Sequence, residues 1–323
     1  MKPLLEVSDL RTSFAGGVIK AVNGVSFDVR EGETVAIVGE SGSGKSVTAM
    51  SILRLIPTPG GEITGGKVVF DGQDLLALDD RRMQRVRGKD IAFIFQEPMS
   101  SLNPVLRIGS QIVEPAVIHR LKSGAKRLHD LCLGLLEKVR IPDPQRRISA
   151  YPHELSGGMR QRAMIAMALA CEPRLIIADE PTTALDVTVQ AQILELLRDL
   201  TRQSRCSMIL ITHDLGVVAR YAQRVNIMYA GRIVESGSTR AIFRGSRHPY
   251  TLGLMASMPG LERRAGQRLQ PIPGQPPDMA RPPAGCPFSP RCSYAVERCH
   301  SEMPPLTSVA PDHNKACWVD VDA

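Results

Sequence analysis

The stretch of sequence that decides the fold is residues 39–46, Gly39-Glu40-Ser41-Gly42-Ser43-Gly44-Lys45-Ser46. It matches the pattern G-x-x-x-x-G-K-[ST], in which glycines let backbone N–H groups wrap around phosphates. The apolar run 34–38 before it is typical of a buried strand, and residues 47–55 after it are typical of a helix. A loop between a strand and a helix places bound phosphates at the helix N-terminus. The sequence therefore predicts a nucleotide triphosphate site, with Lys45 on the β/γ-phosphates and Ser46 on Mg²⁺.

Two acidic residues, Asp179 and Glu180, follow a hydrophobic run that begins at residue 174. In open α/β sheets the ligand lies at the carboxyl ends of the strands. We expect Asp179 to hold the Mg²⁺ shell and Glu180 to polarise the attacking water as general base. The alternative is a plain solvated strand end. The phosphate loop upstream favours the functional interpretation.

A second anion-binding helix start is predicted at Ser156, Gly157 and Gly158, where a hydroxyl N-cap precedes two glycines. One ATP needs only one phosphate loop. We therefore interpret this helix start as a cap on the γ-phosphate of an ATP that is bound to another subunit. This interpretation implies a head-to-tail dimer with two ATPs in the interface.

The composition is that of an ordinary globular protein, with 43% hydrophobic residues and a formal net charge of +7. No run approaches the ~20 apolar residues that would span a bilayer. The first residues lack the apolar core of a secretory signal, so we expect a cytosolic chain. The positive charge fits polyphosphate or anionic lipid headgroups, and a slightly basic solvated surface explains it equally well.

The pattern along the chain alternates strands with helices, which predicts an α/β fold with a largely parallel sheet. We expect strands near residues 67–70, 91–95, 174–180 and 208–213, and helices at 108–118, 126–139, 157–171 and 187–202. The helical stretch at about 98–160 is predicted to be a subdomain inserted between two halves of the sheet.

The composition changes near residue 245, because 13 of the 24 prolines lie in residues 246–323. We expect residues 1–245 to form the nucleotide-binding domain and residues 246–323 to form a separate extension. A proline-rich segment with few apolar residues needs a staple to hold one shape. No catalytic motif lies beyond His213, so the ATP site is expected to be independent of this extension.

Taken in order and spacing, these motifs resemble the nucleotide-binding subunits of ABC transporters over residues 5–245. The resemblance includes Gln96, the run 183–186 (Thr183-Ala184-Leu185-Asp186) and His213. It implies that Gln96 contacts Mg²⁺ or water and reports on a transmembrane partner. It also implies that His213 holds the γ-phosphate and orients Glu180, and that Asp186 acts across the dimer interface.

The resemblance also implies a set of ATP and Mg²⁺ ligands that combines the phosphate loop with four other residues. This set is Phe14 (stacking on adenine), Gly39, Glu40, Ser41, Gly42, Ser43, Gly44, Lys45, Ser46, Val47, Gln96 and Asp179. One departure is Met159, where the commonest family signature has Gln. The phosphate contacts of that motif come from Ser and Gly, so we expect no loss of activity.

Residues 247–251, 286–292 and 155–162 resemble the ATPases of dipeptide and oligopeptide importers, most closely the D-type subunit. The likeness implies import of di- or oligopeptides, with nickel, glutathione or opines as alternatives in the same subfamily. Implied partners are a second ABC ATPase (an F-type subunit or a second copy), two transmembrane permeases and an extracytoplasmic solute-binding protein. The implied location is peripheral, at the cytoplasmic face of the bacterial inner membrane, with no nucleic acid.

Two other classes of function fit the sequence less well. A soluble ABC-type ATPase of DNA repair or translation would show a long heptad coiled coil, paired C-x2-C modules or two cassettes, and none is present. A small-molecule kinase would leave the helix start at Ser156 and the residue His213 without a role.

Four of the seven cysteines, Cys286, Cys292, Cys299 and Cys317, cluster with the spacing C-x5-C-x6-C-x17-C. In a reducing compartment such a cluster indicates a metal site before disulfides. The absence of tight C-x2–4-C pairs argues against zinc, and four thiolates suit a [4Fe–4S] cluster, to which the resemblance also points. Zinc with His300 or His313 replacing one thiolate, and unliganded cysteines, stay open. Cys132, Cys171 and Cys206 are expected to be core residues.

Overall fold

The computed structural model describes residues 2–97, 101–183, 185–258 and 271–321, and the chain forms two compact units. Unit 1 comprises Met1–Val29, Thr34–Leu76 and Thr212–Ala323. Unit 2 comprises Arg30–Glu33 and Ala77–Ile211. The phosphate loop and the C-terminal extension therefore belong to one unit, and the helical segment and the Asp179-Glu180 pair belong to the other.

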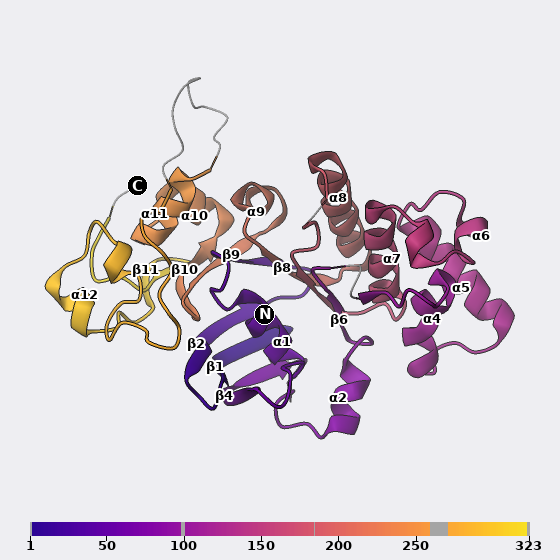
Figure 1. The fold of residues 1–323 in the computed structure, drawn as a ribbon, viewed down its shortest axis with the longest axis horizontal. Coiled ribbons are helices and arrows are strands. Elements are labelled where there is room, and N and C mark those ends of the chain that lie inside the picture. The colour runs from indigo at the N-terminus through magenta and orange to yellow at the C-terminus, as the bar shows by residue number, and fades with distance from the viewer. Residues whose placement is uncertain (1, 98–100, 184, 259–270, 322–323) are drawn as a thin grey trace. The chain divides into compact units, whose positions relative to one another are not determined.

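Unit 1 begins with an antiparallel sheet in the order β2-β1-β4-β5 (Figure 1). Polar and apolar residues alternate along β1, as a strand with one buried face requires. Leu5 pairs with Val29 on one side and with Phe70 on the other. The strands are β1 (Leu5–Phe14), β2 (Ile19–Val29), β4 (Gly61–Phe70) and β5 (Gln73–Asp74).

A second sheet portion in unit 1 carries the phosphate loop. Its order is β11-β12-β10-β9-β3, with β3 and β9 parallel and the other pairs antiparallel. The bounds are β3 (Thr34–Val38), β9 (Arg224–Tyr229), β10 (Arg232–Ser238), β11 (Thr307–Ala310) and β12 (His313–Lys315). The helices of this unit are α1 (Lys45–Ile52), α9 (Leu215–Tyr221), α10 (Thr239–Gly245), α11 (Pro249–Ala256) and α12 (Glu297–Ser301).

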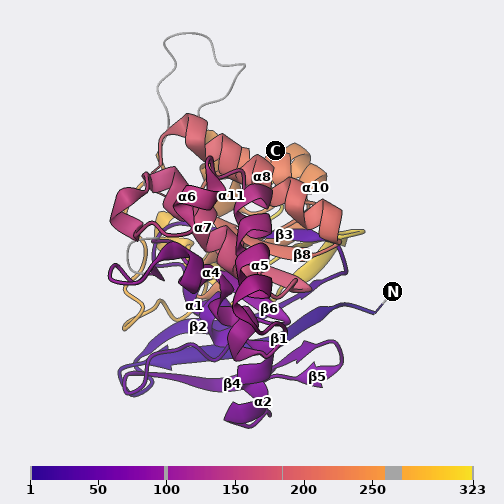
Figure 2. The same ribbon diagram turned by 90° about the vertical axis from the view of Figure 1, so that its right-hand side faces the viewer.

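Unit 2 contains three parallel strands in the order β8-β7-β6. Its helices include α4 to α8, which Figure 2 labels. The strands are β6 (Ile91–Ile94), β7 (Leu175–Asp179) and β8 (Ser207–Thr212), whose last residue belongs to unit 1. The helices are α2 (Asp80–Val86), α4 (Ile108–Ile118), α5 (Ala125–Lys138), α6 (Pro144–Arg147), α7 (Gly157–Leu169) and α8 (Val187–Ser204). Every residue of β7 and β8 is buried, as expected for central parallel strands.

The α/β fold and most of the expected elements are confirmed. The helix expected at 108–118 is α4 with the same bounds, and Ser156 is the N-cap of α7. The sheets are more mixed than predicted, because the antiparallel strands β10–β12 extend the parallel part. In the parts of the chain that the structure describes, no helix is both long and apolar enough to cross a lipid bilayer.

The C-terminal extension shares a core with the strand that precedes the phosphate loop. Tyr250, Phe288 and Cys299 belong to the same buried cluster as Val38 and Ile227. The predicted domain boundary near residue 245 stays a prediction. The proline-rich segment holds its shape through a few large buried side chains, which periodicity does not reveal.

Glu235 of β10 ties this extension to the sheet from a fully buried position. Its carboxylate accepts hydrogen bonds from the backbone N–H of Arg247 at 2.6 Å and of His248 at 3.2 Å. It also lies 2.7 Å from Nε2 of His313 on β12. Two segments of the chain, residues 247–248 and β12, therefore depend on one side chain for the partners of their polar groups.

We expect Glu235→Ala to lower the free energy of unfolding of the extension by about 3–5 kcal/mol, because several buried donors lose their acceptor. Urea unfolding followed by fluorescence of Trp318, the single tryptophan, measures this loss. Glu62→Ala, at an exposed position of β4, is the control and should change stability by less than about 0.5 kcal/mol. Equal urea midpoints for both variants would contradict the assigned role.

Candidate functional site

The phosphate loop runs from the end of β3 into α1, as the sequence predicts. The buried Lys45 is the first residue of α1, and Gly44 before it has a φ of 99°, which favours glycine. Nζ of Lys45 donates to the carbonyl oxygens of Gly39 and Glu40, both at 2.9 Å. The ammonium group is thus held inside the curve of the loop, where it can neutralise phosphate charge.

The backbone of the loop packs directly against β9 and its following turn. A Cβ atom on Gly39 would stand 2.1 Å from the carbonyl oxygen of Met228, so no side chain fits there. The N–H of Gly231 donates to the carbonyl of Ser43 at 2.9 Å. These contacts constrain the conformation of the loop backbone.

The extension contacts the loop at Glu40. Both terminal nitrogens of Arg291 donate to the Glu40 carboxylate, at 2.7 and 3.1 Å. The backbone N–H of Glu40 donates to the hydroxyl of the buried Tyr250 at 2.8 Å. The hydrogen bonds to Glu40 raise the pKa of the Arg291 guanidinium, so this side chain is a permanent cation.

Unit 2 carries the two predicted acids at the end of β7. Asp179 is buried, and Glu180 follows in the left-handed region with a φ of 43°. Nε2 of Gln96 donates to Oε2 of Glu180 at 3.1 Å, and Oγ1 of Thr183 donates to the same oxygen at 2.9 Å. One carboxylate oxygen is therefore oriented by two side chains, which suits a general base that must present its other oxygen in a fixed direction.

The predicted signature residues open α7. Oγ of Ser156 accepts from the N–H of Met159 at 3.3 Å, so the hydroxyl caps the helix. A Cβ atom on Gly158 would stand 2.8 Å from Cγ1 of Val189, which explains the glycine by close packing of α7 against α8. Asp186 caps α8 by accepting from the N–H of Val189 at 3.0 Å. Ala184 of the run 183–186 lies outside the described residues.

Two further predicted residues lie at strand ends in unit 1. Phe14 is the last residue of β1, and its ring lies against Gly61. His213 follows β8 and is exposed. Their roles at adenine and at the γ-phosphate stay predictions, as do the roles of the other site residues.

The four clustered cysteines line one cavity in unit 1, together with His248, Phe288 and Trp318. Burial raises the pKa of the Cys286 thiol to about 11, and it also raises the pKa of Cys292 and of Cys317. Among residues 2–97, 101–183, 185–258 and 271–321, no group of three or more His, Cys, Asp or Glu side chains is arranged to hold a metal ion.

The remaining cysteines and the two histidines considered as zinc ligands do not line the cysteine cavity. His313 is committed to Glu235, and neither it nor His300 lines the cysteine cavity, which removes support for a mixed zinc site. Cys132 and Cys206 are buried core residues as expected, and Cys171 is partly buried.

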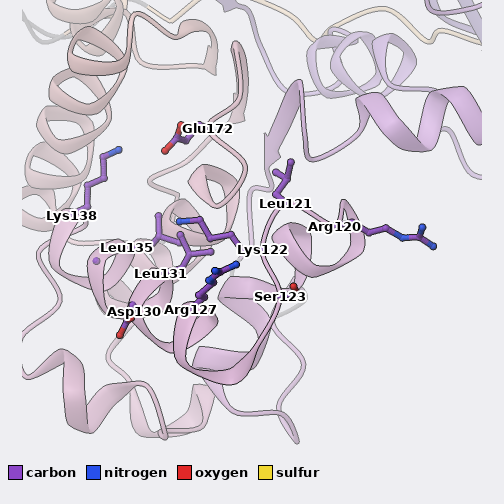
Figure 3. Close-up of a pocket in the computed structure, with 11 residues that line it drawn as sticks. Arg120, Leu121, Lys122, Ser123, Arg127, Asp130, Leu131, Leu135, Lys138 and Glu172 are labelled. Atoms are coloured by element: carbon purple, nitrogen blue, oxygen red, sulfur yellow. The ribbon is translucent and has the colours of Figure 1, made fainter.

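A separate hollow of about 650 Å³ opens on unit 2 (Figure 3). Its walls come mainly from α5 and from the turn before it, and they carry exposed basic side chains such as Lys122 and Arg127. None of its lining residues belongs to the predicted ATP site.

Residues 22–183 match the family model described as ABC transporter. The chain belongs to the ABC transporter family. It is therefore an ABC ATPase. Residues 234–299 of this cassette also match a model described as the oligopeptide/dipeptide transporter C-terminal region.

Relatives of this ABC ATPase are similar over its full length. A peptide import ATP-binding protein of Brucella melitensis is 54% identical, with 100% of this chain and 99% of the relative covered. The oligopeptide transport ATP-binding protein OppD of Bacillus subtilis is 53% identical, with 98% of this chain and 88% of the relative covered. The dimeric ATP-binding cassette MJ0796, solved with ADP and Pi, has a TM-score of 0.65 and is 30% identical over 73% of this chain and 99% of that one.

Sequence reasoning missed the residues that position the predicted ones. Arg291 and Tyr250 contact a loop more than 200 positions earlier in the chain, and Gly231 contacts it from nearly as far. No local pattern signals such a contact. Tyr250 and Arg291 do lie in the motifs at residues 247–251 and 286–292, but these motifs indicate a family resemblance and not a contact with the loop.

We expect Gly39→Ala to weaken ATP binding by roughly tenfold or more, because its Cβ atom would force the loop away from Met228. Calorimetric titration with ATP and Mg²⁺ measures the dissociation constant. Gly245→Ala, with open space around the added Cβ atom, is the control and should bind as the unchanged protein does. Unaltered affinity in Gly39→Ala would show that the loop tolerates displacement at this contact.

Proposed function

We propose that this chain is the ATP-hydrolysing subunit that energises import of di- or oligopeptides through an ABC transporter. The observation that carries the proposal is the C-terminal match at residues 234–299 joined to full-length similarity with proteins named for peptide import. That region lies outside the ATP motifs, so its match carries information that the shared ATPase chemistry does not. Peptides are therefore favoured over nickel, glutathione or opines.

In the proposed reaction, Lys45 and the N–H groups of the loop bind the phosphates, and Ser46 and Asp179 hold Mg²⁺. Glu180 accepts a proton from the attacking water while its carboxylate is oriented by Gln96 and Thr183. The N–H groups at the start of α7 would stabilise the γ-phosphate of an ATP bound to a partner subunit, with Ser156 capping that helix. His213 would stabilise the γ-phosphate of this chain's own ATP.

The proposed assembly is a dimer of ATPase subunits, with an F-type subunit or a second copy as the partner. It would work with two transmembrane permeases and an extracytoplasmic solute-binding protein, at the cytoplasmic face of the inner membrane. Apolar residues that are exposed at the end of α4 support a permease contact: Val117 (46%), Ile118 (66%) and Leu121 (46%). Leu121 also lines the hollow on unit 2 (Figure 3).

We expect Glu180→Gln to lower the hydrolysis rate of the assembled transporter by at least ~10²-fold, because an amide cannot accept the proton. The variant should still bind ATP and accumulate as a dimer that holds it, whereas Lys45→Ala should lose ATP binding. Phosphate release and size-exclusion chromatography measure the two effects. Glu137→Gln, an exposed acid on α5, is the control and should hydrolyse ATP normally. A Glu180→Gln transporter at full rate would remove Glu180 from the role of base.

We further propose that the cysteine cavity is the site of a [4Fe–4S] cluster. Cys286, Cys292, Cys299 and Cys317 supply the four thiols that such a cluster needs, and they converge on one cavity. When bound, the cluster would supply a structural cross-link or an electron-transfer centre.

The cavity between the four thiols is too small for a cluster unless the cysteines move. The cavity measures about 10 Å³, which is near the space of one water molecule. Binding therefore requires the cysteines to move apart. Cys292 and Cys317 are only partly buried, so they are the ligands best able to move.

We expect protein purified without oxygen to be brown, with about four irons and four sulfides per chain. Cys292→Ser should lose the colour and make the extension sensitive to protease, because cluster binding adds to the stability of the folded segment. Cys171→Ser, a cysteine outside the cavity, is the control and should keep the iron. Stoichiometric zinc without iron, or no metal at all, would refute the cluster.

A further inference from the structure

We propose that Arg291 is a positioning residue for the phosphate loop, so that the C-terminal extension sets the affinity of the chain for ATP. The inference rests on the proposed ATP site and adds a residue outside the motifs that influences the affinity of this site. Arg291 lies outside every ATP motif of the sequence, and the expectation that the extension is independent of the ATP site gives way to a direct contact.

Arg291 and Glu40 form a bidentate ion pair that is largely shielded from solvent. One terminal nitrogen of Arg291 stands 2.7 Å from Oε2 of Glu40, and the other stands 3.1 Å from Oε1. The Arg291 side chain is 5% exposed and that of Glu40 is 27% exposed. Paired planar groups of this kind fix direction as well as distance.

Arg291 is itself held by the rest of unit 1. Its Nε donates to the carbonyl of Pro273 at 2.9 Å, and a terminal nitrogen contacts the hydroxyl of Tyr229 at 3.3 Å. The guanidinium also lies over the rings of Tyr229 and Phe288, 5.9 Å from each centroid. The side chain is therefore a rigid support for Glu40, because it cannot swing away without losing several contacts.

Glu40 is fixed at three points as a result. Its carboxylate binds Arg291, its N–H donates to Tyr250, and its carbonyl accepts from Nζ of Lys45. Two of these three points come from the extension. The third is the lysine that neutralises phosphate charge, so a displaced Glu40 would also disturb Lys45.

Charge gives Arg291 a second effect on ATP binding. A carboxylate in a loop that binds a polyphosphate repels its ligand unless a cation compensates it. In the extension, Arg291 is the guanidinium that supplies this compensation to Glu40 at hydrogen-bond distance. Loss of the arginine would thus leave a repelling charge as well as a loosened loop.

The direction of Arg291 depends on the turn between two of the cysteines. Arg291 ends the turn Ser289–Arg291, in which its N–H donates to the carbonyl of Phe288 at 3.0 Å. The turn is bracketed by Cys286, whose carbonyl accepts from the N–H of Ser289, and by Cys292, whose N–H donates to the carbonyl of Ser289. Whatever orders the cysteines also orders the residue that holds the loop.

The test is a charge-removal cycle on the full-length chain, read by calorimetric titration with Mg²⁺ and the non-hydrolysable ATP analogue adenylyl imidodiphosphate. Arg291→Gln should weaken binding by roughly tenfold or more. The double variant Arg291→Gln with Glu40→Gln should bind more tightly than Arg291→Gln, because the repelling charge is gone, and less tightly than the unchanged protein, because the contact that holds the loop is still missing. Arg291→Lys keeps the positive charge but cannot form two parallel hydrogen bonds to the carboxylate. Its affinity should lie between that of Arg291→Gln and that of the unchanged protein.

Arg298→Gln is the matched control, because Arg298 pairs with Glu302 in the same extension and does not contact the loop in the described structure. Its affinity should equal that of the unchanged protein. Far-UV circular dichroism checks that each variant is folded, because Arg298 lies 3.5 Å from the centroid of the Trp318 ring and its replacement alters the fluorescence of a folded chain. If Arg291→Gln fails to fold, Arg291→Lys carries the test and should weaken binding, because the fork that holds Glu40 is lost.

Two results would overturn the inference. Unchanged affinity in folded Arg291→Gln, or in Arg291→Lys if only that variant folds, would show that the ion pair does not act on the loop. A double variant as weak as the single one would reduce Arg291 to a packing residue. Lys45→Ala separates this failure from failure of the ATP site itself: if it loses binding while Arg291→Gln does not, only the role of Arg291 is wrong.

Discussion

The phosphate loop has no room for a side chain at the two points where its backbone meets neighbouring strands. A Cβ atom on Gly39 would stand 2.1 Å from the carbonyl of Met228, and one on Gly44 would stand 2.3 Å from the carbonyl of Ala21. Such contacts exist only when β2, β3 and β9 are already in register. The site that binds phosphate is thus a property of the assembled sheet, although its sequence motif is only eight residues long.

The proline-rich extension is ordered by the same sheet that supports the phosphate loop. Because β9 continues into β10, and β10 pairs with β12, the extension is bound to the sheet that supports the loop. Tyr229 of β9 packs against Tyr250 and Phe288 of the extension, with ring centroids 4.6 and 5.3 Å apart. Three aromatic rings supply much of the buried apolar surface that the segment otherwise lacks.

The sequence predicts those features of the site that are local. A glycine pattern between strand and helix, a hydroxyl before Gly157 and two acids after a buried strand are each decided by their nearest neighbours, and the structure has them in the expected elements. The three-residue strand β12 is too short to show a periodicity. The contact from Arg291 to Glu40 spans 251 positions, and only the tertiary fold can reveal it.

Coupling between the extension and the loop has to act in both directions. If an ordered extension holds Glu40 and thereby favours nucleotide binding, then bound nucleotide must favour the ordered extension by the same free energy. Glu40 is partly exposed, so solvent reduces what the ion pair with Arg291 contributes. The hydrogen bond from the Glu40 N–H ends on the hydroxyl of Tyr250, whose side chain is fully buried. The two contacts together let a segment without catalytic residues share in the energetics of ATP binding.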